Sequence, residues 1–288
     1  MQQLMDRQGS VVDGSTADGR PQILFAHANG YPPGSYQRLL EQLGTYGQVL
    51  TVEHRPLWQP APIPRFLPWR VYAEDLINTL ARSKAGPLWL VGHSMGAITG
   101  MLAAQQAPRH FKGVIALDPV LMPRSVLLAG SVMMRFLRRE MTITQRALNR
   151  PHRFDDHQAA FDFYRSKRPF KNIDDEVLWH YVRAGHAPAA DGSVALRWAG
   201  AWEACVYRSA PFMLSRLRQF KLPMLGIAGQ DSDVLTPATL KAWQQAMPSL
   251  DLHVVPGGHL VPLEASSVCA DLAIDFIERH DRSKPLNL

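Results

Sequence analysis

The sequence has little cysteine and no long apolar run, and these two absences exclude several classes of protein. Only two cysteines occur among 288 residues, Cys205 and Cys269, and they lie too far apart for a zinc ribbon or a disulfide framework. We therefore expect both to be buried, small apolar side chains. No stretch approaches the roughly 20 apolar residues that span a bilayer, and the N-terminus lacks the basic and then apolar layout of a secretory signal. We expect a cytoplasmic protein without stable membrane insertion.

Acidic residues are scarce in the middle of the chain, which carries the whole charge excess. Residues 123–220 contain 16 Lys and Arg against 9 Asp and Glu, which gives this region a net charge of +7. The net charge of the complete chain is +6. A nucleic-acid site would need a basic stripe with interleaved aromatic residues or a known binding module, and neither is present. We expect no nucleic-acid partner. A solvated basic face, or attraction for anionic substrates or lipids, accounts better for the charge.

Short apolar runs alternate with segments of helical spacing on both sides of this basic region. Strand-like runs occur at residues 21–30, 48–56, 87–94 and 111–122, and again at 221–237 and 250–259, with helical patterns between them. Such alternation predicts parallel βαβ units. Residues 123–220 have mostly helical patterns. The fold class is therefore α/β, with a mostly parallel core in residues 1–122 and 221–288 and a helical insertion at 123–220.

A polar serine interrupts one strand-to-helix junction, in the segment Pro87 to Ala104, "PLWLVGHSMGAITGMLAA". The GxSxG pattern by itself is weak evidence. Between a buried strand and a helix, however, Gly92 and Gly96 permit a sharp turn that lifts the Ser94 hydroxyl above the sheet. Ser94 then lies at a helix N-terminus, where free N–H groups favour a developing anion. We predict that Ser94 is a nucleophile.

A base and an acid follow later strands, as a serine nucleophile requires. His259 follows the last strand-like run in a glycine-rich loop, and Asp231 and Asp233 follow the preceding run. All three lie at the carboxyl ends of strands, where open α/β sheets bind ligands. His259 is the expected base, and either aspartate could orient it.

With these residues in place, the chain resembles the α/β-hydrolase superfamily from about Pro21 to His280, and the order Ser, Asp, His is that of the superfamily. The stretch "HANGYP" resembles its oxyanion loop, which implies that the backbone N–H groups of Asn29 and Met95 form an oxyanion hole. The superfamily places its acid a few residues before a Thr-Pro that opens the next helix, and by this likeness "SDVLTP" favours Asp233 over Asp231. In such proteins an insertion at residues 123–220 forms a helical cap. The stretches "HANG" and "HRPLW" together resemble a subgroup of bacterial hydrolases.

The resemblance implies a serine hydrolase that cleaves carboxylic esters, with a small-molecule ester as substrate, through an acyl-enzyme, and with Ser94, Asp233 and His259 as the catalytic triad. No cofactor or metal is expected. An acyltransferase, a carbon–carbon bond hydrolase with the same triad, and a ligand receptor without turnover stay open as alternatives. The proline-rich stretch from Trp58 to Trp69 either lines the pocket or contacts a second subunit, so a homodimer also stays open.

Overall fold

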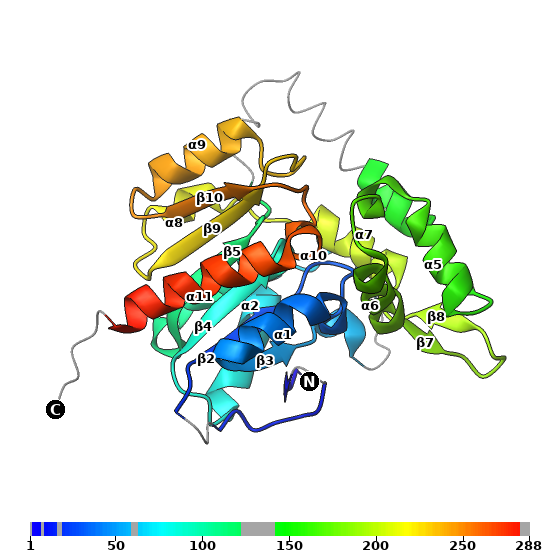
Figure 1. Ribbon diagram of the computed structural model, residues 1–288, viewed down its shortest axis with the longest axis horizontal. Coiled ribbons are helices and arrows are strands. Elements are labelled where there is room, and N and C mark those ends of the chain that lie inside the picture. Colours follow the sequence, from blue (N-terminus) through cyan, green and yellow to red (C-terminus); the bar gives the residue numbers. More distant parts are fainter. Residues whose placement is uncertain (1, 7–8, 16–18, 59–62, 122–141, 283–288) are drawn as a thin grey trace.

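The protein is built on a seven-stranded sheet. It is seen here in a computed structural model that describes residues 2–6, 9–15, 19–58, 63–121 and 142–282 (Figure 1). The strand order is β1-β3-β2-β4-β5-β9-β10. The strands are β1 (Leu4–Asp6), β2 (Gln22–Ala26), β3 (Gln48–Val52), β4 (Leu88–His93), β5 (Phe111–Leu117), β9 (Met224–Gly229) and β10 (Asp251–Val255).

The strand pairs are parallel throughout this sheet except for β1, which runs antiparallel to β3 at one edge. Strands β2, β4 and β9 are buried along their whole length, as strands covered on both faces must be. The predicted α/β class with a mostly parallel sheet is confirmed. The short strand β1 was not predicted, because its three residues carry no alternating pattern long enough to detect.

Helices cover both faces of the sheet and bury two apolar clusters. On one face lie α2 (Trp69–Arg82), α3 (Met95–Gln106) and α9 (Pro237–Ala246); on the other lie α1 (Gln37–Tyr46) and α11 (Ser266–Arg282). Successive residues of β2 serve opposite clusters: Leu24 and Ala26 join the first, and Ile23 and Phe25 the second. With both faces covered, the free ends of the parallel strands are the place where a site can form.

The elements from β6 to α7, which lie between β5 and β9 in the chain, form a group of their own at one side of the sheet (Figure 1). They are β6 (Arg153–Phe154), α5 (His157–Arg165), η5 (Arg168–Phe170), α6 (Asp175–Gly185), β7 (His186–Pro188), β8 (Val194–Leu196) and α7 (Gly200–Arg208). The short helix α8 (Leu214–Leu217) also precedes β9, but it lies against α9. Helix α6 packs against the 3-10 turn η1 (Pro33–Tyr36), which follows β2.

This group is not wholly helical, which corrects one expectation. Strands β6, β8 and β7 form a small antiparallel sheet. Its hairpin turns at Gly192, whose φ of +84° few other residues adopt, and Asp191 accepts hydrogen bonds from the N–H and hydroxyl of Ser193. The strands are two or three residues long. Runs this short show no periodicity that a sequence reading can use.

Two smaller expectations can also be compared with the structure. Cys205 and Cys269 are both free and buried, as predicted. Within the described ranges, no helix combines the length and the apolar character that crossing a membrane requires. The start of the predicted insertion, at residues 123–141, lies outside the described residues, so the proposed domain boundary there stays a prediction.

Candidate active site

Ser94 lies at the tight turn between β4 and α3, in a backbone conformation that few non-glycine residues adopt. Its φ is +53° and its ψ is −114°. The turn closes only because its neighbours lack side chains: a Cβ on Gly96 would lie 2.0 Å from the Ala26 carbonyl oxygen, and one on Gly92 would lie 2.6 Å from Ala97. The Ser94 N–H also donates to the Leu117 carbonyl at 3.0 Å. The sharp turn expected from the sequence is therefore present.

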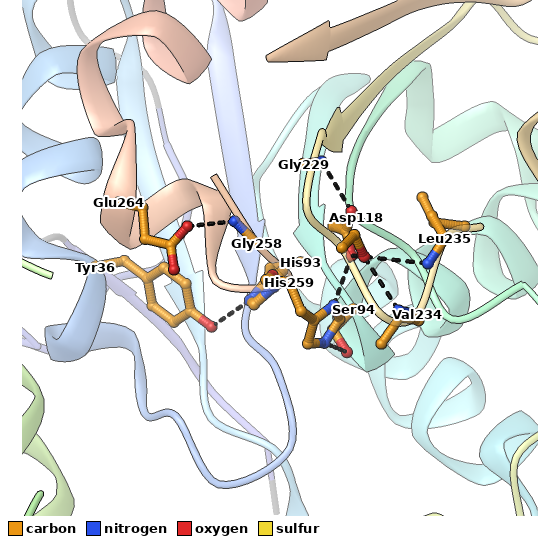
Figure 2. A network of polar contacts seen from close by, with 11 residues as sticks. Tyr36, His93, Ser94, Asp118, Gly229, Val234, Leu235, Gly258, His259 and Glu264 are labelled. Carbon is orange, nitrogen blue, oxygen red and sulfur yellow. Dashed lines mark hydrogen bonds and ion pairs between the residues drawn. The ribbon is translucent and has the colours of Figure 1, made fainter. Parts of the chain in front are cut away.

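The hydroxyl of Ser94 lies beside the imidazole of His259 (Figure 2). Ser94 Oγ and His259 Nε2 are 3.0 Å apart, within hydrogen-bond distance. His259 follows β10 in a loop whose shape depends on Gly257, with a φ of +127°. The Gly258 N–H donates to the carboxylate of Glu264, from α10 (Val261–Glu264), which holds this loop against the following helix. The structure thus brings together the two residues that the sequence singled out as nucleophile and base.

The acid that contacts His259 is Asp118, and this corrects the expectation for Asp233. Asp118 Oδ2 lies 2.6 Å from His259 Nδ1. Asp118 follows β5 directly, is fully buried, and has a φ of +39°. Because a carboxylate only accepts hydrogen bonds, His259 Nδ1 carries the proton and Nε2 is left to accept one from Ser94.

The loop after β9 explains why Asp233 does not take this position. Gly229 donates its N–H to Asp118 Oδ1 at 3.0 Å, and the Ser232 hydroxyl donates to Oδ2 at 2.7 Å. Ser232 Oγ in turn accepts from the N–H groups of Val234 and Leu235. The loop therefore turns Ser232 towards the buried carboxylate, whereas Asp231 and Asp233 are both exposed, and Asp233 lines the cavity above Ser94.

A sequence signal for Asp118 did exist. In "FKGVIALDPV" a carboxylate stands directly after an apolar strand and before a proline, and this strand neighbours the one that carries Ser94. A charged residue that ends a fully buried strand needs a polar partner at the sheet edge. The likeness to a Thr-Pro spacing favours the loop after the following strand instead.

A second chain of polar contacts links His259 to the loop after β2 (Figure 2). His93 Nε2 lies 2.8 Å from the His259 carbonyl, so this nitrogen must donate and Nδ1 must accept. The Tyr36 hydroxyl therefore donates to His93 Nδ1, at 2.7 Å, while its oxygen accepts the Ala28 N–H at 3.3 Å. Burial holds the pKa of His93 well below its usual range, which keeps the ring in this neutral form. His93 therefore connects the backbone of His259 to Tyr36 and the loop after β2.

The "HANG" loop is held in place by contacts with the "HRPLW" stretch. His27 Nδ1 donates to the Ala28 carbonyl at 2.8 Å, and His27 Nε2 accepts the His54 N–H at 3.1 Å. The two imidazole rings pack with centroids 4.4 Å apart, and burial lowers the pKa of His54 to about 4. Arg55 then forms an ion pair with Asp75 of α2. His27 thus holds this loop through its two hydrogen bonds.

The two residues expected to supply an oxyanion hole both line the cavity that contains Ser94. Met95 is the first residue of α3, where a backbone N–H has no acceptor within its own helix. Asn29 lies in the loop after β2, and its side-chain amide donates to the Glu203 carbonyl of α7 at 3.1 Å. This contact ties the loop to the group of elements between β5 and β9.

The cavity above Ser94 has a volume of about 1320 Å³ between the described residues. One side is formed by the ends of the sheet strands and their loops, and the other by residues between β5 and β9. Most of its wall is apolar, including Val120, Leu121, Phe163, Phe170 and Phe212. A cavity of this size and character suits a largely apolar small molecule that presents a reactive group to Ser94.

Comparisons with known proteins point to the same architecture. Over 211 residues the chain is 25% identical to the 2-(acetamidomethylene)succinate hydrolase of Mesorhizobium japonicum, a match that covers 72% of this chain and 70% of that protein. It is 36% identical over 106 residues to the monoglyceride lipase of Rattus norvegicus, but this match covers only 35% of either protein. A crystal structure of E-2-(acetamidomethylene)succinate hydrolase superposes with a TM-score of 0.74 at 24% identity, covering 90% of this chain and 91% of that one, and this likeness shows the fold.

A family model gives the broader assignment. The model for the alpha/beta hydrolase fold matches residues 60–266, well over half of the chain. This range includes Ser94, Asp118 and His259. The chain therefore belongs to the alpha/beta hydrolase fold family.

Proposed function

We propose that the protein is a serine hydrolase that cleaves carboxylic esters through an acyl-enzyme intermediate. The observation that carries this proposal is the continuous line of contacts from Ser94 Oγ to His259 Nε2, at 3.0 Å, and from His259 Nδ1 to Asp118 Oδ2, at 2.6 Å. A serine hydroxyl is a weak nucleophile at neutral pH and needs a base oriented by an acid. The proposed triad is thus Ser94, His259 and Asp118, with Asp118 in the place for which Asp233 was expected.

In the proposed mechanism, Ser94 Oγ attacks the ester carbonyl while His259 Nε2 takes its proton. The tetrahedral intermediate collapses to an acyl-enzyme, and His259 returns the proton to the leaving alcohol. Water, deprotonated by His259, then cleaves the acyl bond and releases the acid. The buried Asp118 carboxylate stabilises the imidazolium that forms in both halves.

The oxyanion is proposed to bind the N–H groups of Asn29 and Met95, and residues 123–220 are proposed to act as a cap. The free N–H at the start of α3 and the position of both residues in the cavity wall support the first point. The shared cavity supports the second, since its lining comes from both parts of the chain. The hydrogen bond from Asn29 to Glu203 would keep the oxyanion loop and the cap in register.

The test is hydrolysis of p-nitrophenyl esters from acetate to palmitate by the purified protein. The apolar cavity predicts turnover with an optimum at one acyl length, because burial of each added methylene stabilises binding until the cavity is full. Absence of turnover across the series, together with fluorophosphonate labelling of Ser94, would contradict ester hydrolysis. That result would favour an acyltransferase, a carbon–carbon bond hydrolase or a receptor.

The Tyr36 hydroxyl is expected to act on catalysis through His93. In Tyr36→Phe, the buried Ala28 N–H and His93 Nδ1 both lose their partner, which should lower the free energy of unfolding by about 1–3 kcal/mol. We expect kcat to fall about tenfold with little change in KM, because the backbone of His259 is held less firmly.

The control for this variant is Tyr46→Phe, a substitution of the same size in α1, away from this chain of contacts. Urea unfolding and steady-state kinetics on the same preparations separate stability from catalysis. If both variants keep the kcat of the wild type, Tyr36 and His93 are structural only.

A further inference from the structure

The wall of the cavity above Ser94 carries an excess of positive charge. Four cations line it, against two carboxylates. The cations are Arg146, Arg150, Lys167 and Arg168, and the carboxylates are Glu203 and Asp233. All four cations lie between β5 and β9, the part of the chain that also carries the basic excess of the sequence.

One of these cations is neutralised inside the protein. Arg150 Nη2 and Glu203 Oε2 are 2.6 Å apart, and both side chains are largely buried, at 14% and 12% exposed. Tyr207 also donates its hydroxyl to Glu203, at 3.2 Å. This pair joins α7 to the segment before β6. It leaves three cations and the Asp233 carboxylate among the described lining residues, which is still an excess of positive charge.

Arg146, Lys167 and Arg168, called here the cationic rim, are exposed and form no ion pair with any residue in the described part of the chain. Arg146 lies in the helical segment before β6, and the other two lie at the junction of α5 and η5. Neighbouring cations do find partners: Arg153 pairs with Asp191, and Arg165 with Asp175. Among the described residues, the rim therefore carries charge without an ion-pair partner, and this charge lines the cavity above the reactive serine.

The chemistry of the wall adds to the effect of this charge. Apolar walls of low polarisability focus the field of nearby cations into a cavity. Burial raises the pKa of Tyr181 and Tyr207, both in the wall, so their hydroxyls stay protonated and cannot add negative charge at neutral pH. An anionic group at the rim would thus meet three cations and no phenolate, with Asp233 the remaining carboxylate among the described lining residues, while the apolar chain behind it fills the cavity.

We propose that the cavity selects esters that carry a second, free carboxylate, with the ester carbonyl at Ser94 and the carboxylate at the cationic rim. This inference rests on the proposed ester hydrolysis. The substrates are monoesters of dicarboxylic acids. Ser94 Oγ bonds to the acyl carbon as the alcohol leaves with a proton from His259, and water then cleaves that bond and releases the dicarboxylate.

The kinetic test compares p-nitrophenyl monoesters of adipate, suberate and sebacate with p-nitrophenyl hexanoate, octanoate and decanoate, which have the same acyl lengths without the terminal charge. Shorter monoesters are avoided because their free carboxylate attacks its own ester. We expect kcat/KM to be at least about tenfold higher for the charged member of one pair, since each exposed ion pair contributes about 1.5- to 5-fold. The acyl length of that pair measures the span from Ser94 to the rim.

The variant Arg146→Gln/Lys167→Gln/Arg168→Gln should lower this preference about tenfold, mainly through KM, because the charges attract the substrate before chemistry begins. Rates with the neutral esters should stay within about twofold, since surface substitutions away from the chemistry have small effects. The matched control is Arg109→Gln/Arg218→Gln/Lys241→Gln, which removes three exposed cations that do not line the cavity. A wild type without preference for the charged esters, or equal effects of the two triple variants, would overturn the proposal.

A binding measurement keeps the test independent of turnover. Suberate, a product of the proposed reaction, is titrated into wild type and both triple variants by calorimetry. The rim variant should bind about tenfold more weakly than the control at low salt, and the difference should shrink at high ionic strength. Turnover of neutral esters without suberate binding would refute carboxylate binding at the cationic rim and would leave the proposed ester hydrolysis standing. Suberate binding that depends on the rim, without turnover of any ester, would refute ester hydrolysis while supporting the anion site.

Discussion

Replacing Asp118 with asparagine is expected to lower kcat/KM for p-nitrophenyl butyrate by about 10³- to 10⁴-fold, as loss of the orienting acid does in serine hydrolases generally. Two effects combine in Asp118→Asn. The neutral side chain no longer stabilises the imidazolium, and its amide NH₂ group can donate to His259 Nδ1, which favours the tautomer that cannot accept the serine proton. The measurement is steady-state kinetics, with thermal unfolding to show that the variant is folded.

The matched control is Asp233→Asn, which makes the same chemical change one loop away. Asp233 is exposed, whereas Asp118 is fully buried. Asp118 Oδ2 lies 2.6 Å from His259 Nδ1. We expect the control to retain the wild-type kcat/KM for this neutral ester within about twofold, as surface substitutions usually do. The opposite ranking of the two variants would assign the acid to Asp233 and contradict the geometry described above.

Replacing Ser94 with alanine is expected to reduce ester hydrolysis by at least about 10⁴-fold, because no other group can form the acyl-enzyme. Ser94→Ala keeps the Cβ and the strained backbone at a φ of +53°, so stability should change little. The residual rate reports what the cavity and the oxyanion N–H groups contribute without a nucleophile. Turnover near the wild-type level would show that another residue performs the chemistry.

The sequence predicted the sheet and the position of two site residues because both depend on local patterns. A buried strand, a serine between close glycines and a following helix occupy consecutive residues, so a sharp turn at Ser94 could be predicted from the small size of the glycines. The structure agrees, because a Cβ on Gly96 would overlap the Ala26 carbonyl. His259 was found in the same way, from a glycine-rich loop after the last strand. Parallel pairing then placed both residues at the same edge of the sheet.

The sequence contains a signal for each candidate acid, but the choice among them depends on contacts between segments more than a hundred positions apart. Three carboxylates follow strands at this edge: Asp118, Asp231 and Asp233. The loop after β9 presents Ser232 and the Gly229 N–H to Asp118, which then fills the position beside His259. Nothing in the spacing of "GQDSDVLTP" reveals which of its side chains turns inwards.

The small sheet and the cationic rim were beyond sequence reasoning for related reasons. Strands β6 and β8 pair residues some forty positions apart in runs too short to show a period. The basic excess of residues 123–220 was visible as a count, but only the folded chain shows that Arg146, Lys167 and Arg168 face one cavity. Composition shows which part of the chain is basic, and the tertiary structure shows which of its basic residues line the cavity.

The most direct test of the proposed triad is the rate at which a fluorophosphonate labels the protein, with the modified residue identified by peptide mass spectrometry. The reaction consumes the activated serine whatever the natural substrate is. We expect a single adduct on Ser94, labelling slowed by orders of magnitude in Asp118→Asn, and a wild-type rate in Asp233→Asn. An adduct on another residue, or slowed labelling in the second variant but not the first, would contradict it.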